Sequence, residues 1–140
     1  IVNWPGKVAP GTSNALISQV DFLATFAAFS GQTLADNDAP DSKNLEQALL
    51  GKDRKGREFI IEQAGGLGIR QGNWKYIEPS KGPKLAVETN TELGNDADPQ
   101  LYDLSRDPGE KQNLAPRYPD LVAKPAVVKA LRAHIRTLGK

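Results

Sequence analysis

The chain contains no cysteine and no methionine among its 140 residues. The absence of cysteine excludes disulfide bonds, thiolate nucleophiles and zinc sites built on cysteine. Aromatic residues make up only 6% of the sequence, but the hydrophobic fraction of 39% is typical of a folded domain rather than a disordered chain. A chain of this length has room for one domain, so a single domain is predicted over residues 1–140.

The sequence also lacks a strong net charge and a long apolar run. Eighteen basic residues against seventeen acidic ones give a net charge of +1. Nucleic-acid-binding modules usually carry a large basic excess, so no nucleic-acid partner is predicted. No apolar run approaches the ~20 residues that span a bilayer, so no membrane partner is predicted either. Because the chain opens at Ile1 without methionine and shows no signal-peptide pattern, we expect a fragment of a longer protein.

Charge is distributed unevenly along the chain. Residues 86–110 include seven acidic side chains and one basic one, whereas residues 111–140 include seven basic side chains and one acidic one. Two solvated faces of one domain, which attract each other weakly, account for this pattern. A basic C-terminal segment that binds a polyanion is the alternative.

A helix is predicted between Ser18 and Gly31. Ser18 followed three residues later by Asp21 is a variant of the capping box, and Gly31 is a typical stop signal. Apolar residues recur at helical spacing between these positions, which predicts a broad apolar face. They are Val20, Phe22, Leu23, Phe26, Ala27 and Phe29. A second, short helical turn is predicted at residues 45–50.

Three short β-favouring runs in the middle of the chain predict an antiparallel meander, because glycine-containing turns separate them. The runs are residues 59–61, 67–69 and 74–77. Residues 84–88 predict either a fourth strand or an extended loop, and residues 101–104 predict another strand.

The C-terminal segment predicts an amphipathic helix. Pro125 suits a first helical turn, and apolar residues then recur at intervals of three and four. They are Val128, Leu131, Ile135 and Leu138. The predicted fold class is therefore α+β, with an antiparallel sheet of about four strands, a C-terminal helix packed across it and an N-terminal helix.

No cluster of residues carries catalytic chemistry by itself, and no catalytic or metal-binding residue is predicted. His134 lies in the predicted C-terminal helix without partner ligands at helical spacing, which favours a structural or exposed role. Asp36, Asp38 and Asp41 lack the glycine and distal glutamate of a calcium loop, which favours a solvated loop. Residues 107–110, with proline second and glycine third, predict a type II turn.

Four segments in sequence order resemble the C-terminal portion of the sulfatases, the alkaline-phosphatase-like superfamily that hydrolyses sulfate esters. Residues 1–7 resemble the family's P-x-I-x-x-W-P-G segment. Residues 18–25 resemble its v-s-x-x-D-l-x-P-T helix start, with Ala24 in place of the usual proline. Residues 68–76 resemble its a-v-R-x-g-x-W-K hairpin, and residues 100–115 match its e-L-Y-D-L-x-x-D-P-x-E-x-x-N-L run at nearly every fixed position.

The resemblance implies a small α+β subdomain that docks on a larger catalytic domain and shapes the pocket for a sulfate ester, such as a sulfated sugar. It implies a formylglycine nucleophile, made from Cys or Ser in a Cys/Ser-x-Pro-x-Arg motif, and a calcium ion in the missing N-terminal catalytic domain. That motif is absent from this sequence. Because a bound divalent metal supplies charge stabilisation in such hydrolysis, we expect the parent protein to be a sulfatase and this chain alone to be inactive. Sulfatases are commonly exported to the periplasm, the lysosome or the medium.

Lys81 and Lys84 are the candidate substrate-binding residues. They lie within residues 78–98, where relatives carry pocket-lining loops, and their positive charges suit a sulfated or carboxylated sugar. Structural roles are predicted for other motif residues, since aromatic side chains pack and charged ones pair locally. Trp74 and Tyr102 are expected between sheet and helix, and Arg70 and Asp103 in local pairs or caps.

Two other functions remain open. A free-standing module for sulfated glycans would use the basic residues Lys129, Arg132 and Arg136 of the C-terminal helix. The chain is alternatively the same subdomain of a related phosphatase or phosphodiesterase. If the chain is a fragment, an exposed apolar patch should remain where the missing domain docked, and the chain should self-associate.

Overall fold

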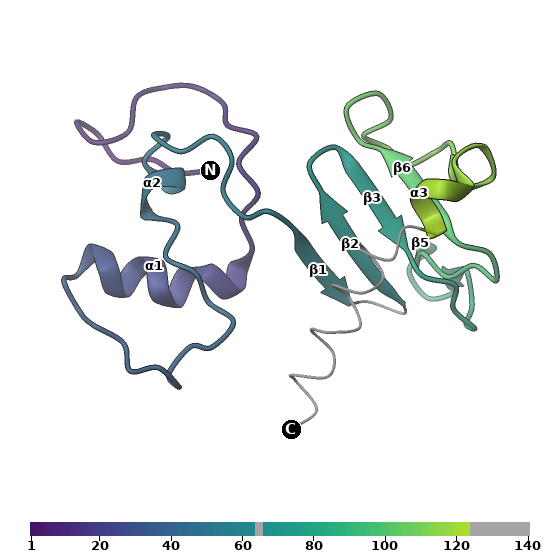
Figure 1. Ribbon diagram of the computed structural model, residues 1–140, viewed down its shortest axis with the longest axis horizontal. Coiled ribbons are helices and arrows are strands. Elements are labelled where there is room, and N and C mark those ends of the chain that lie inside the picture. The colour runs from purple at the N-terminus through teal and green to yellow at the C-terminus, as the bar shows by residue number, and fades with distance from the viewer. Residues whose placement is uncertain (64–65, 124–140) are drawn as a thin grey trace. The chain divides into compact units, whose positions relative to one another are not determined.

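The computed structural model describes residues 1–63 and 66–123 (Figure 1). Contacts divide the chain into two compact units, Ile1–Ile60 and Ile61–Lys140, and each is described here by itself. The single domain expected over residues 1–140 stays a prediction. The amphipathic helix expected after Pro125, including His134, lies outside the described residues.

The first unit contains the predicted N-terminal helix. It begins as a 3₁₀ turn, η1 (Gln19–Asp21), and continues as α1 (Phe22–Phe29). The backbone N–H of Ser18 donates to Asp21 Oδ2 at 3.0 Å, which satisfies a free donor at the helix start. Gly31 follows the helix with a φ of 69°, as the stop signal predicted. The second helical turn is α2 (Glu46–Leu49).

The carboxylate of Asp21 organises this unit from a fully buried position. Arg57 Nε donates to Asp21 Oδ2 at 2.7 Å and to Oδ1 at 2.9 Å, and Arg57 Nη2 also contacts this carboxylate. The backbone N–H of Lys43 donates to Asp21 Oδ1 at 3.0 Å. Burial raises the pKa of Asp21, but the hydrogen bonds from Arg57, Lys43 and Ser18 outweigh it and hold this pKa below the ordinary value of 3.8.

Thr25 fixes the same side of the helix one turn further on. Its side chain is fully buried, accepts the N–H of Leu45 at 2.9 Å and donates to the carbonyl of Lys43 at 3.3 Å. The buried apolar residues beside this polar network are few: Leu16, Leu45 and Ala48. Hydrogen bonds therefore hold α1 to the loop before α2, and little apolar packing supports them.

A glycine allows two chain segments of this unit to meet. Leu16 and Gly56 form a parallel bridge, in which the N–H of Leu16 donates to Lys55 O and the N–H of Arg57 donates to Leu16 O. Gly56 has a φ of 65°, and a Cβ there would lie 2.3 Å from the carbonyl oxygen of Leu16. A side chain at position 56 is therefore incompatible with the bridge that positions Arg57.

The second unit is built on a four-stranded antiparallel sheet in the order β1-β2-β3-β6 (Figure 1). The strands are β1 (Ile60–Gln63), β2 (Leu67–Gln71), β3 (Trp74–Ile77) and β6 (Gln100–Asp103). Gly72 has a φ of 58° in the turn between β2 and β3, as predicted. The α+β class, the antiparallel sheet and the N-terminal helix are thus confirmed, and α3 (Pro119–Ala123) is the described helix nearest the C-terminus.

The segment at residues 84–88, left open between strand and loop, adds no strand to the main sheet. Its residues Leu85–Ala86 form β4, which pairs with β5 (Thr91–Glu92) in a separate two-stranded ribbon. Hydrogen bonds of Asn95 join the two ends of the segment that contains this ribbon. Asn95 Nδ2 donates to Pro83 O at 2.9 Å, and Ser80 Oγ donates to Asn95 Oδ1 at 2.8 Å.

The two faces of the main sheet have different characters. Ile69, Tyr76 and Leu101 stand opposite one another on β2, β3 and β6 and are buried. On the other face, Lys75 stands opposite Tyr102. Side chains alternate between faces along a strand, so one face is an apolar core and the other carries polar groups.

We predict that Arg57→Ala lowers the free energy of unfolding by about 3 kcal/mol at pH 7, because it leaves a buried carboxylate without its cation. Urea unfolding of both chains measures the difference. Lys52→Ala, at an exposed position of the same unit, is the control and should stay within about 0.5 kcal/mol of the parent chain.

The pH dependence has a defined sign. Because the folded pKa of Asp21 lies below 3.8, its contribution is complete above about pH 5 and is lost as the pH falls through the folded pKa. Asp21→Asn removes this contribution, so its stability deficit should shrink between pH 5 and pH 3. A deficit that stays constant over this range contradicts the assignment of the stabilisation to the charged carboxylate.

Candidate functional site

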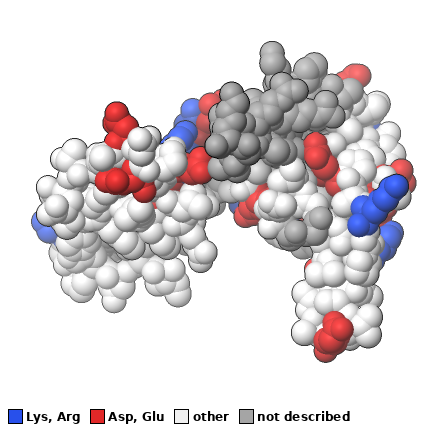
Figure 2. All heavy atoms as spheres, turned by 90° about the horizontal axis from the view of Figure 1, so that it is seen from below, with Lys and Arg blue, Asp and Glu red and all other residues white. Residues whose placement is uncertain are grey.

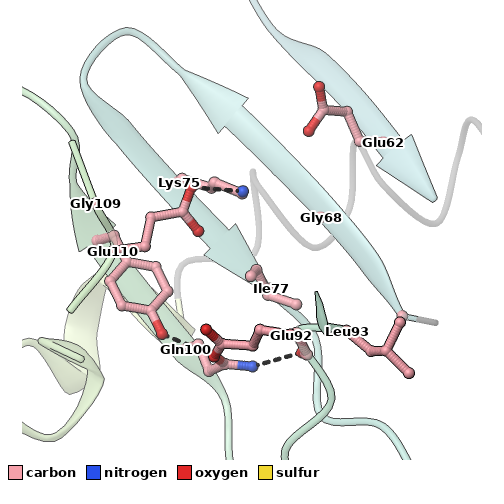
Figure 3. Close-up of a pocket in the computed structure, with 12 residues that line it drawn as sticks. Glu62, Gly68, Lys75, Ile77, Glu92, Leu93, Gln100, Gly109 and Glu110 are labelled. Carbon is pink, nitrogen blue, oxygen red and sulfur yellow. Dashed lines mark hydrogen bonds and ion pairs between the residues drawn. The ribbon is translucent and has the colours of Figure 1, made fainter. Parts of the chain in front are cut away.

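A hollow of about 330 Å³ lies on the polar face of the sheet in the second unit (Figure 3). Strands β1, β2, β3 and β6 line it together with the end of the β4–β5 ribbon and the turn at residues 107–110. Its lining residues are Glu62, Gly66, Gly68, Lys75, Ile77, Glu92, Leu93, Gly94, Gln100, Tyr102, Gly109 and Glu110. Four of these residues are glycines, so missing side chains contribute to the space.

Hydrogen bonds and one ion pair fix the polar groups of the hollow. Lys75 Nζ lies 2.7 Å from Glu110 Oε1, and a dashed line marks this ion pair in Figure 3. Tyr102 Oη donates to Gln100 Oε1 at 2.7 Å, and Gln100 Nε2 donates to the carbonyl of Gly94 at 2.8 Å. The amide of Gln100 therefore joins the sheet to the loop after β5, and its orientation is set from both sides.

The turn that carries Glu110 differs from the expected one. The N–H of Glu110 donates to Asp107 O at 3.1 Å, but Gly109 is not among the residues with positive φ and Glu110 itself has a φ of 52°. The type II prediction is therefore wrong, because that turn requires positive φ at Gly109. The ion pair with Lys75 accompanies this uncommon backbone conformation of a residue other than glycine.

The hollow has a negative electrostatic character. Three glutamates and one lysine line it, and the lysine is paired with one of the glutamates. Burial raises the pKa of Tyr102, and the nearby carboxylates of Glu110 and Glu92 raise it further. Such a lining offers acceptors to hydroxyl or ammonium groups and repels an anionic sulfate.

Lys81 and Lys84, the predicted substrate-binding residues, do not line this hollow. Lys81 is exposed. Lys84 Nζ lies 2.7 Å from Asp96 Oδ2, and this hydrogen bond raises the pKa of Lys84 and lowers that of Asp96. Their contact with a substrate stays a prediction.

The motif residues make local structural contacts. Trp74 packs against the ring of Tyr118, with centroids 5.7 Å apart. Asp103 accepts the N–H of Ser105 at 3.0 Å, and Arg70 Nε donates to Gly72 O at 3.3 Å. Tyr102 is buried and lines the hollow, on the face of the sheet that it shares with its cross-strand partner Lys75. The expected C-terminal helix lies outside the described residues, so the packing of Tyr102 between sheet and helix stays a prediction.

Metal chemistry has no support in the described part of the chain. Among residues 1–63 and 66–123, no group of three or more His, Cys, Asp or Glu side chains is arranged to hold an ion. The residues described here thus do not fit a calcium centre. Within the same residues, no helix is long and apolar enough to cross a membrane.

A second candidate site is the outer side of α1, here called the α1 apolar face and defined as Val20, Phe22, Leu23 and Phe26. Val20, Leu23 and Phe26 are each 54% exposed and Phe22 is 38% exposed. Figure 2 shows the first unit, at the left, with a large uncharged surface beside a cluster of acidic side chains. The apolar stripe that normally faces the core is on the outside of this unit.

An exposed apolar patch is therefore present on the first unit, whereas its origin in a lost domain and the self-association of the chain stay predictions. Sequence periodicity located its residues but did not reveal that they are exposed. The hollow itself was not predicted, because its lining residues come from several separate elements. Two signals were available. Gln100, Tyr102 and Glu110 lie together in the motif at residues 100–115, and Gly68 is a glycine inside a strand, which often marks a close approach.

Comparison with known proteins finds sulfatases. No protein-family model matches the chain. The N-acetylgalactosamine-6-O-sulfatase of Bacteroides thetaiotaomicron is 50% identical over 124 residues, which is 87% of this chain and 24% of that protein. Human arylsulfatase A is 32% identical over 145 residues, which covers 92% of this chain and 28% of that protein. The chain thus spans about a quarter of the length of these curated relatives.

Solved structures give the same result. A structure from work on the metabolism of multiple glycosaminoglycans by Bacteroides thetaiotaomicron matches with a TM-score of 0.83 and 46% identity, over 93% of this chain and 27% of that one. The PsFucS1 sulfatase from Pseudoalteromonas sp. matches with a TM-score of 0.73 over 97% of this chain and 29% of its own. Its identity of 20% supports the fold alone.

We predict that Tyr102→Phe lowers the free energy of unfolding by about 1–2 kcal/mol, because it leaves the buried Gln100 Oε1 without its donor. Tyr118→Phe is the matched control at an exposed tyrosine of the same unit and should change stability by less than about 0.5 kcal/mol. Thermal unfolding of the three chains measures both effects. Equal stability of the two variants would show that the hydrogen bond between Tyr102 and Gln100 contributes nothing to the free energy of unfolding.

Proposed function

This chain is a sulfatase homologue that matches about a quarter of its relatives' length, and on this premise we propose that it serves as the C-terminal subdomain of a sulfuric ester hydrolase. In this role it docks on the catalytic domain of the parent protein and shapes the substrate pocket. The observation that carries the proposal is the match at 46% identity to one quarter of a larger solved protein.

The chemistry of hydrolysis is assigned to the rest of the parent protein. The formylglycine nucleophile and the calcium ion implied by the family belong to the catalytic domain, and the motif that forms the nucleophile is absent from this sequence. When bound, calcium supplies charge stabilisation at the sulfate group. The residues of this chain contribute shape and charge around the substrate, so it is proposed to be inactive alone.

Within this function, Lys81 and Lys84 are proposed as contacts for a sulfated or carboxylated sugar. The side chain of Lys84 is 71% exposed although its amine is paired with Asp96, so it remains accessible to an anion. The negative lining of the hollow is unsuited to a sulfate group, and neither Lys81 nor Lys84 lines it, so this contact is proposed outside the hollow. The relative from Bacteroides is an N-acetylgalactosamine-6-O-sulfatase, which makes a sulfated amino sugar the first substrate to test.

The other functions considered from sequence receive less support. The two curated relatives reported above are sulfatases, which favours this family over a phosphatase or phosphodiesterase. The glycan-binding module depends on Lys129, Arg132 and Arg136, which lie outside the described residues. An exported parent, in the periplasm, the lysosome or the medium, is proposed on the family resemblance.

We predict that the chain alone does not hydrolyse an aryl sulfate, whereas a hybrid sulfatase that contains it does. In the hybrid, this chain replaces the matching segment of the Bacteroides N-acetylgalactosamine-6-O-sulfatase, to which it is 50% identical. The hybrid should recover at least about one tenth of the parent activity, which is a loss of at most ~1.4 kcal/mol in transition-state stabilisation.

The control is the same sulfatase without any segment at this place, which should be inactive. Saturable turnover by the isolated chain overturns the assignment of catalysis to the missing domain. A folded hybrid with no activity overturns the proposed role in shaping the pocket.

We predict that Lys81→Glu/Lys84→Glu in the hybrid raises KM roughly tenfold with kcat nearly unchanged. The reason is that the double substitution removes an interaction that is equally strong in the bound substrate and in the transition state. Steady-state kinetics on a sulfated amino sugar measures both constants. Asp96→Asn is the matched control, because it breaks the same ion pair without adding negative charge. Unchanged KM in the double variant, or an equal rise in the control, removes these lysines from the substrate site.

A further inference from the structure

We propose that the α1 apolar face is the surface on which the first unit packs against the rest of the sulfatase polypeptide. This proposal rests on the proposed function and adds the surface that makes the contact. The occupant is a segment of the same parent chain, and its chemistry is apolar and uncharged.

The helix is held with its polar residues inside. Asp21 and Thr25 are 0% exposed, whereas Val20, Leu23 and Phe26 are 54% exposed. Rotating the helix to bury the apolar residues would bring the carboxylate of Asp21 away from Arg57 and Thr25 away from Leu45. Because buried polar groups keep their partners, the outward position of the apolar residues is the stable arrangement of this unit.

The exposed side chains form one continuous surface. The rings of Phe22 and Phe26 are stacked with centroids 5.3 Å apart, and those of Phe26 and Phe29 are 6.4 Å apart. Trp4, 42% exposed, meets Phe29 edge-on at 5.4 Å. Large connected apolar surfaces of this kind mark interaction sites rather than ordinary scattered exposure.

The composition of the surface favours a permanent partner. The eight residues of α1 include no charged side chain. Permanent interfaces resemble a domain core cut in half, whereas transient ones are as polar as the rest of the surface. The matched relatives are about four times as long as this chain, and their additional polypeptide is the permanent partner that this proposal assigns to the face.

The experiment compares one substitution in two settings. Leu23→Asp/Phe26→Asp is introduced into the isolated 140-residue chain and into the hybrid sulfatase described above. Gln32→Asp/Gln47→Asp, at two exposed positions of the same unit, is the control with the same number of added charges. Thermal unfolding, sedimentation and aryl sulfate turnover are measured for each protein.

In the isolated chain, the double substitution on the α1 apolar face should leave the melting temperature within about 2 °C of the parent, because these side chains are already in water. In the hybrid it should lower the melting temperature by roughly 10 °C or more and reduce turnover at least tenfold, while the control changes neither. This difference between settings is what the proposal requires.

Other results overturn it. Equal loss of stability in both settings identifies the residues as part of the core of the unit itself. No effect in the hybrid shows that nothing covers the face there. A variant that only converts a dimer of the isolated chain to a monomer identifies a second copy as the occupant. Inactivity of the unmodified hybrid is a separate outcome, which contradicts the proposed function and removes the premise of this one.

Discussion

The buried pair between Asp21 and Arg57 is the interaction on which the first unit depends. It joins the start of α1, the loop before α2 and the segment that leads into the sheet, since Asp21 also accepts the N–H of Lys43. A buried carboxylate tolerates no loss of these donors, so it fixes which side of the helix faces inward. Because this constraint fixes the rotation of the helix, the side chains of Phe22, Leu23 and Phe26 are left exposed to solvent.

Sequence patterns predicted where helices and strands form better than they predicted which side of each element is buried. The helix between Ser18 and Gly31 and the strands of the meander have local causes, namely caps, glycine turns and β-favouring runs. Which side of the helix is buried depends on Arg57, which is 36 residues away from Asp21 and belongs to no pattern. The surroundings of Tyr102 depend in a similar way on the register of β6 against β3, which sets it opposite Lys75 and which no local pattern predicts.

The hollow and the α1 apolar face differ in polarity and in how far their side chains are satisfied within their own unit. The hollow is polar, negatively charged and held by hydrogen bonds within its own unit, so it exists without any other part of a larger protein. The α1 apolar face is complete only when something covers it. The sheet unit thus satisfies the polar groups of its hollow internally, while the helical unit leaves large apolar side chains exposed.

The distance along the chain between Asp21 and Arg57 also bears on folding. Closing a loop of 36 residues costs entropy before the carboxylate finds its guanidinium, and the hydrogen bonds form only afterwards. The hairpin of β2 and β3 closes through a tight turn at Gly72, which is a local and fast event. The order of assembly is therefore expected to run against the order of the sequence, with the sheet formed first and the helical unit completed last.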